Sequence, residues 1–254
     1  MIRSHTVRTE RAQQEAQRRY YSDTASSYHE LHVGCDEHHR AMTMLLPILG
    51  CVGIRTILDV GAGTGRAVEF FGDKGFQAFG IEPVAALVRN GQERNTQLAG
   101  RIVQGDGGKL PFADGSFDAV CAFGVMHHVK HPSTLVSEMQ RVAKSAIVIS
   151  DGNRFGQGRL FTRVLKLLLW KAGVWPICKW VRNGGRSVML SDGDGLAYSY
   201  SVYDSFDQAA SVAEKVLLLS TDKRWHKSWW GPLLTSSCVL MVATNKQCDQ
   251  ALQL

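Results

Sequence analysis

Three closely spaced glycines, Gly61, Gly63 and Gly65, follow a short apolar run and precede a helix-like stretch. Glycine has no Cβ and tolerates positive φ, so such a turn lets a ligand approach the backbone closely. A dinucleotide site would have its third glycine where this chain has Arg66, and no G-x-x-x-x-G-K-[ST] phosphate loop is present. Asp59 adds a carboxylate beside the turn, which suits a cation better than a pyrophosphate. The turn therefore predicts a positively charged ligand without phosphates.

Further polar residues follow the turn in a consistent order. Glu82 ends the next apolar run, 21 residues after Gly61. Asp106 and Gly107 lie in the stretch "GDGGKLPFADGSFDAV", and "CAFGVMHHV" follows at 121–129. These three segments follow the glycine turn in a fixed order along the chain.

Residues 50–151 resemble the class I S-adenosylmethionine-dependent methyltransferases, because these four motifs occur in the family's order. They look closest to its small-molecule branch, which includes ubiquinone-biosynthesis-like enzymes. The resemblance implies S-adenosyl-L-methionine as cofactor, with Glu82 on the ribose hydroxyls and Asp106 on the adenine amino group. The sulfonium and ammonium groups of this cofactor agree with the carboxylate of Asp59. The implied cofactor-binding residues are Asp59, Gly61, Ala62, Gly63, Gly65, Glu82, Pro83, Asp106, Gly107 and Phe123.

Methyl transfer from a sulfonium is a direct displacement, which needs a positioned acceptor and a base wherever that acceptor loses a proton. His127 and His128 follow an expected strand at the edge where the methyl group should point, and imidazole titrates near neutral pH. Asp151, at the end of the next strand, is a second candidate for the base or for orienting the acceptor. Two alternatives stay open: a buried histidine can hold the loop, and Asp151 can cap the following turn.

The acceptor is expected to be a small molecule, methylated at oxygen, with nitrogen and carbon left open. Enzymes that methylate amino groups of nucleic-acid bases carry (N/D)-P-P-(Y/F), where this chain has "FGVM" at 123–126, so nucleic acid is not expected. Cytosine C5 enzymes need a nucleophilic cysteine, and Pro176 and Cys178 lie in the wrong region. The N-terminal segment resembles family helices that close over the cofactor, so the expected substrate-binding residues are Tyr20, Tyr21 and Tyr28. The aromatic-rich segment 192–207 is also expected to shape the acceptor pocket.

Two stretches could suggest a metal, but neither has the spacing of a recognised site. "SDGDGL" at 191–196 places Leu196 at the third ligand position of a calcium loop. The N-terminal segment lacks a zinc spacing, although it contains His29, His32, Cys35, His38 and His39. No metal is expected.

Strands that alternate with helical patterns must position these residues. This alternation predicts βαβ units and a parallel sheet with right-handed crossovers. The expected strands are 56–60, 76–83, 101–106, 116–124 and 145–151, and the expected helices include 66–74 and 132–142. Segments 215–221 and 236–244 have no helix between them, which predicts an antiparallel pair.

The fold class is therefore α/β, with a Rossmann-like, seven-stranded, mostly parallel sheet and helices on both faces. We expect one methyltransferase domain over residues 1–254. Its expected parts are N-terminal cap helices (1–50), a cofactor-binding core (51–151), an insert or substrate lid after the fifth strand (152–214) and the terminal strand pair (215–246).

The insert contains a basic amphipathic stretch, 159–182. Arg159, Arg163 and Lys166 share one helical face among leucine, phenylalanine and tryptophan residues. Such a helix can lie on an anionic membrane, which would favour a lipid or quinone-like acceptor. The preferred interpretation is a lid helix whose apolar side faces the core and whose basic stripe is solvated.

Composition limits the class of protein. The chain has 254 residues, a net charge of +6, and six cysteines without a C-x-x-C pair. The charged first residues lack the apolar core of a secretory signal, and no stretch is long enough to span a bilayer. We therefore expect a cytoplasmic protein, with peripheral membrane contact as an alternative and the oligomeric state left open. Functional alternatives are a non-catalytic cofactor-binding partner protein and a nicotinamide oxidoreductase, against which Arg66 argues.

Overall fold

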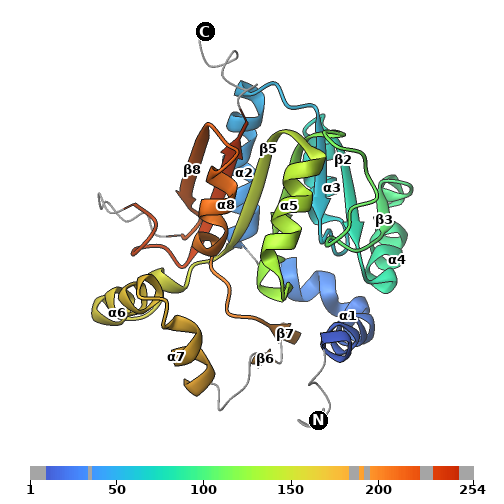
Figure 1. Ribbon diagram of the computed structural model, residues 1–254. Coiled ribbons are helices and arrows are strands. Elements are labelled where there is room, and N and C mark those ends of the chain that lie inside the picture. The colour runs from blue at the N-terminus through green and yellow to red at the C-terminus, as the bar shows by residue number, and fades with distance from the viewer. Residues whose placement is uncertain (1–9, 34–35, 183–188, 192–194, 224–230, 246–254) are drawn as a thin grey trace.

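The computed structural model describes residues 10–33, 36–182, 189–191, 195–223 and 231–245 (Figure 1). A seven-stranded sheet has the order β3-β2-β1-β4-β5-β9-β8. The first five strands are parallel, and β9 runs antiparallel to both β5 and β8. The strands are β1 (Thr56–Val60), β2 (Gln77–Glu82), β3 (Ile102–Gln104), β4 (Phe117–Phe123), β5 (Ala143–Gly152), β8 (Lys215–Ser220) and β9 (Cys238–Thr244).

Helices cover both faces of this sheet. The buried positions Leu135, Val136 and Met139 of α5 pack on one face, together with α8. The other face carries α2, α3 and α4. Within the described residues, the helices are α1 (Glu10–Val33), α2 (Asp36–Cys51), α3 (Arg66–Asp73), α4 (Ala85–Arg94), α5 (Pro132–Val142), α6 (Leu160–Lys171), α7 (Trp175–Arg182) and α8 (Phe206–Ala210), with 3-10 turns η1 (Thr96–Leu98), η2 (Met126–His128), η3 (Arg154–Gly156) and η4 (Val202–Ser205).

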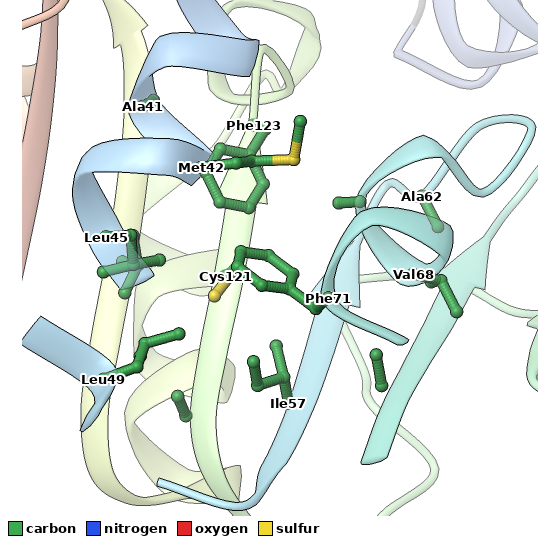
Figure 2. Packing of buried hydrophobic residues seen from close by; sticks show 14 of the residues in the cluster. Ala41, Met42, Leu45, Leu49, Ile57, Ala62, Val68, Phe71, Cys121 and Phe123 are labelled. Carbon is green, nitrogen blue, oxygen red and sulfur yellow. The ribbon is translucent and has the colours of Figure 1, made fainter. Parts of the chain in front are cut away.

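The N-terminal helices join this core. Met42 and Leu45 of α2 are fully buried, and they pack in one cluster with Phe71 and Phe123 (Figure 2). The preceding helix, α1, crosses the end of the molecule at which β5 finishes (Figure 1). Parallel sheets bind ligands at the carboxyl ends of their strands, so α1 covers the edge where a site is expected.

The predicted sheet is confirmed, with strand ends shifted by no more than three residues. Each predicted strand is present, and the terminal pair is antiparallel as expected. The apolar β-branched run of β1 has four buried residues because neighbouring strands and helices cover it. None of the helices in the described part of the chain combines the length and apolar character needed to cross a bilayer.

The insert differs from the expectation. Residues 159–182 form two helices instead of one, since the chain turns at Gly173, whose φ is 71°. A small hairpin follows, made of β6 (Met189–Ser191) and β7 (Gly195–Ala197). The predicted core-facing apolar side is found only in part: Trp170 packs against the buried Phe155, whereas Leu160 and Phe161 are exposed. Arg163 and Lys166 of the predicted basic stripe are partly exposed and also donate to backbone carbonyls.

The core cluster gives a stability prediction. Replacing the fully buried Phe71 with alanine leaves a cavity, and we expect the free energy of unfolding to fall by about 3–5 kcal/mol. The matched control Phe161→Ala removes a ring that is 77% exposed, so its effect should stay within about 0.5 kcal/mol. Urea unfolding followed by circular dichroism measures both variants. Equal losses in the two would contradict this description of the core.

Candidate active site

A cavity of about 520 Å³ opens at the carboxyl ends of the parallel strands. Its size falls within the range of about 300–1,000 Å³ that is usual for small-molecule sites. Its walls come from α1, the turn after β1, the end of β2, the loop before β4, the segment after β4, and β7 with the residues that follow it. It therefore brings together segments that are up to 185 residues apart in the chain, as the contact between Gln13 and Tyr198 shows.

The glycine turn forms the floor next to β1. Gly61 has a φ of 75°, and its N–H donates to the carbonyl of Ile81 at 2.8 Å. A Cβ at position 61 would lie 2.5 Å from Cγ2 of Val125, and one at Gly63 would lie 3.3 Å from the ring of Tyr28. Glycine is required at both positions by the positive φ and the close packing.

Glu82 lines the cavity with a carboxylate that two backbone groups hold in place. The N–H of Gly63 donates to Oε2 at 2.9 Å, and the N–H of Val84 donates to Oε1 at 3.0 Å. Burial raises the pKa of Glu82 to about 7, although both N–H groups lower it. Each carboxylate oxygen has a second lone pair, so the fixed group can also accept from two ligand hydroxyls.

Asp59 does not line the cavity, contrary to the expectation that it lies beside the ligand. Successive strand residues face opposite sides, so Asp59 points with Ile57 to the face that α3 covers. It is buried, and Oδ1 has no hydrogen-bond partner among the described residues. Burial raises its pKa to about 8, against the charge of Arg66, which lowers it.

Asp106 and Gly107 lie on the cavity wall. The Oδ1 atom of Asp106 accepts from the N–H of Gly108 at 2.9 Å, and Oδ2 lies 3.7 Å from the guanidinium of Arg18. A Cβ at Gly107 would lie 2.9 Å from side-chain atoms of Val60 and Leu135. The Asp106 side chain is 61% exposed, so it can meet a polar ligand group at the mouth of the cavity.

His128 is the one catalytic candidate among the three that lines the cavity. Its Nδ1 lies 2.8 Å from the carbonyl oxygen of Leu196 and 3.2 Å from Nε2 of Gln17. Its Nε2 lies 2.9 Å from Oη of Tyr21, so a hydrogen bond joins these two side chains. The imidazole is therefore held through both ring nitrogens, with Nε2 directed at Tyr21.

His127 and Asp151 pair with each other outside the cavity lining. Asp151 Oδ1 lies 2.9 Å from Nδ1 of His127, and Oδ2 accepts from the His127 N–H at 3.3 Å. Burial would raise the pKa of Asp151, but His127 and the N–H of Gly152 outweigh it and lower the pKa. The His127 carbonyl accepts from the N–H of Tyr198 at 2.7 Å. This geometry favours the alternative in which both residues hold the loop.

Comparison with known proteins assigns the chain to a family. A family model described as "Methyltransferase domain" matches residues 58–148. An "Uncharacterized methyltransferase" of Mycobacterium sp. (strain JLS) is 30% identical over 177 residues, which are 70% of this chain and 68% of the relative. One of Mycobacterium tuberculosis (strain ATCC 25177 / H37Ra) is 30% identical over 188 residues, covering 73% and 71%. The chain belongs to the class I S-adenosyl-L-methionine-dependent methyltransferases.

Solved structures of low sequence identity show the same fold. The structure of magnesium protoporphyrin IX methyltransferase from Synechocystis PCC 6803 with bound SAM gives a TM-score of 0.59 at 11% identity, covering 92% of this chain and 97% of that one. A possible histamine N-methyltransferase from Thermotoga maritima gives 0.56 at 16% identity, covering 90% and 99%. This methyltransferase therefore has the family's sheet and helices along most of its length.

The remaining predicted residues divide between the cavity and its support. Tyr21, Tyr28, Pro83 and Phe123 line the cavity, whereas Ala62, Gly63, Gly65 and Tyr20 do not. A Cβ at Gly65 would collide with Leu98 and Ile102, so this glycine serves packing. Tyr20 packs edge-on against Tyr21, with ring centroids 5.4 Å apart.

Several wall residues were not predicted individually. Gln13 and Gln17 of α1 meet residues near β7: Tyr198 Oη donates to Gln13 Oε1 at 2.9 Å, and the Leu196 N–H donates to Gln17 Oε1 at 2.5 Å. The aromatic-rich segment was the available signal, and its expected part in the pocket is confirmed at positions 196 and 198. Nothing in the periodicity of α1 singles out its glutamines.

The residues considered for metals are only partly described. Cys35 and the calcium-like residues 192–194 lie outside the described residues, as do the side chains of His29 and His32. His38 is described, and its Nδ1 lies 3.3 Å from Oγ of Ser150. His39 packs its ring edge-on against Phe70, with centroids 5.3 Å apart. Within the described ranges, no group of three or more His, Cys, Asp or Glu residues is arranged to hold a metal ion.

Asp59 gives a prediction on pH dependence. Because its pKa is about 8 in the folded chain against an ordinary 3.8, the folded state binds more protons between these values. The free energy of unfolding should therefore fall as pH rises from 5 to 8. We expect Asp59→Asn to reduce this fall by up to roughly 4 kcal/mol, while Glu82, whose pKa is shifted in the same direction, keeps part of it.

Urea unfolding at several pH values without cofactor measures these slopes. The exposed Asp73 at the end of α3 provides the control variant Asp73→Asn, which should keep the wild-type slope. A wild-type slope in Asp59→Asn would show that this carboxyl titrates as in an unfolded chain.

Proposed function

We propose that this methyltransferase transfers a methyl group from S-adenosyl-L-methionine to a hydroxyl oxygen of a small-molecule acceptor. The observation that carries the proposal is the 2.9 Å contact between Tyr21 Oη and His128 Nε2. Both residues line the cavity that also contains Glu82. The proposed proton acceptor, His128, and the proposed cofactor-binding carboxylate, Glu82, would thus act in the same cavity.

The cofactor residues are assigned by combining the family resemblance with this geometry. Glu82 would hold the ribose hydroxyls, because both its oxygens are already fixed by backbone N–H groups. Asp106 would accept from the adenine amino group, and Gly61 would let the methionine part approach the backbone. When bound, the cofactor supplies the methyl group as a carbon attached to a cationic sulfur. Asp59 would act at longer range, as a buried carboxyl under the turn.

The acceptor side is assigned to Tyr21 and His128. A hydroxyl that gains a methyl group must lose its proton, and a positioned base contributes typically about 10²–10⁴-fold to such a step. Tyr21 can take the acceptor proton while it passes its own to Nε2 of His128. The Leu196 carbonyl, 2.8 Å from Nδ1, would hold the ring so that Nε2 faces Tyr21. His127 and Asp151 would position the loop that carries His128.

The first acceptors to test are phenols and quinols. The sequence resembles the ubiquinone-biosynthesis-like branch, and the walls contributed by Tyr28, Leu196 and Tyr198 suit a planar, partly apolar molecule. A lipid or quinone-like acceptor is the second candidate, favoured by the exposed apolar side chains of α6 and α7.

The catalytic assignment predicts a loss of turnover without a loss of cofactor binding. In Tyr21→Phe and His128→Gln, we expect kcat to fall by about 10²–10⁴-fold, because the proton path is interrupted. The matched control is Tyr20→Phe, which removes the hydroxyl group of a neighbouring tyrosine outside the cavity lining and should keep kcat. Transfer of labelled methyl groups to a panel of phenols measures kcat, and calorimetry with S-adenosylhomocysteine measures binding. Wild-type kcat in Tyr21→Phe would contradict this assignment.

The cofactor assignment predicts a pH-dependent affinity. Ionised Glu82 makes stronger hydrogen bonds to hydroxyls than its protonated form, so affinity for S-adenosylhomocysteine should rise as pH increases through about 7. Glu82→Gln should bind roughly tenfold more weakly or worse, with a flat pH profile. The exposed Glu93 on α4 gives the control Glu93→Gln. Binding without turnover of any acceptor would favour a non-catalytic partner protein.

A further inference from the structure

The helices α6 and α7 expose an unusual number of apolar side chains. Of the thirteen exposed large hydrophobic residues in the described ranges, nine lie between 160 and 181, and the other four are scattered. We call these nine the α6–α7 surface: Leu160, Phe161, Val164, Leu165, Leu168, Val174, Ile177, Trp180 and Val181. Phe161 is 77% exposed and Leu160 is 66% exposed. Large exposed apolar patches usually mark an interaction surface.

The helix α6 contacts the protein through two basic side chains and through Trp170, whose ring packs edge-on against the buried Phe155. Arg163 donates through Nη1 to the carbonyl of Leu234 at 2.8 Å. Lys166 donates through Nζ to the carbonyls of Arg154 and Gln157 at 3.0 and 2.9 Å. The exposed apolar side chains of α6 recur at helical spacing, so they form a row on the side of the helix that faces away from the protein. A surface helix usually turns its apolar side to the protein core and its polar side to water.

The second helix is anchored at its start. Trp175 is 9% exposed, and the guanidinium of Arg154 lies 5.5 Å from the centre of its ring. Arg154 also forms an ion pair with Asp204, which ties α7 to the folded body. Ile177, Trp180 and Val181 then follow at helical spacing, each 59% exposed or more. The apolar side chains of both helices are therefore held outward by a fixed framework.

Charge identifies the kind of partner. Residues 152–191 contain eight Lys and Arg residues and no Asp or Glu, so the remainder of the chain has a net charge of 6 − 8 = −2. An isologous contact with a second copy would bring two such segments together and make like charges repel. A surface of anionic lipids attracts basic residues, while its interface accepts exposed leucine, phenylalanine and tryptophan side chains.

We propose that the α6–α7 surface docks on a membrane that contains anionic lipids. The apolar side chains enter the interface, and the exposed Arg159 and Lys171 contact lipid headgroups. Figure 1 shows α6 and α7 at the same end of the molecule as β7 and α1, which contribute walls of the cavity. Docking therefore places that end of the enzyme at the membrane. The inference does not depend on the acceptor or on the catalytic assignment.

Co-sedimentation with vesicles tests this inference in the full-length chain without cofactor. We expect the protein to pellet with phosphatidylcholine vesicles that contain one-third phosphatidylglycerol at low ionic strength. Binding should weaken with added salt and with phosphatidylcholine alone. The double variant Phe161→Ser with Ile177→Ser should bind about tenfold more weakly or worse. Lys171→Glu, which reverses an exposed charge at the end of α6, should also weaken binding.

Matched controls distinguish docking through the α6–α7 surface from nonspecific adsorption to vesicles. Val103→Ser with Val212→Ser removes two exposed apolar side chains elsewhere, and Arg89→Glu reverses an exposed charge on α4. Both should bind vesicles as the wild type does, and all variants should keep the wild-type melting temperature. The inference is overturned if the wild type stays in the supernatant at low salt, or if the surface variants bind normally. It is also overturned if the wild type binds no vesicles and forms a dimer that the double variant dissociates.

Discussion

The hydrogen bonds that fix Glu82 are the constraint on which the rest of the site depends. Its carboxylate joins the glycine turn after β1 to the end of β2, through the N–H groups of Gly63 and Val84. A buried carboxylate is costly unless it is hydrogen-bonded, so the turn must keep its shape for Glu82 to stay in place. That shape requires glycine, since Val125 and Tyr28 occupy the space beside the turn. The proposed cofactor-binding carboxylate and the shape of the glycine turn therefore depend on each other.

Much of this fold could be predicted from local patterns. The run at 56–60 is apolar and β-branched, and the run at 116–124 is mostly apolar, because both faces of a parallel strand are buried. The orientation of α6 could not be predicted in the same way. Its amphipathic pattern is the same whether the apolar side meets a core or faces outward. Only tertiary contacts, such as Arg163 with Leu234, distinguish the two.

The residues of the site show the same distinction between local pattern and tertiary packing. Glu82 at the end of β2 and Asp106 just after β3 could be placed because parallel strands bring their carboxyl ends together. Asp59 could not, since one step of strand alternation moves its side chain from the cavity to the α3 face. The wall between α1 and β7 depends on contacts such as Tyr198 with Gln13, which follow from chain packing and leave no mark in local spacing. The pairing of His128 with Tyr21 is of the same kind.

The central claim is that the cavity beside Glu82 binds a sulfonium cofactor instead of a nucleotide diphosphate. Isothermal titration calorimetry of the purified wild-type chain with S-adenosylmethionine, S-adenosylhomocysteine and NADH measures this directly. We expect saturable binding of the first two at a stoichiometry of about one, as one cavity requires, and no heat from NADH. Tight NADH binding without heat from either sulfur compound would contradict the account.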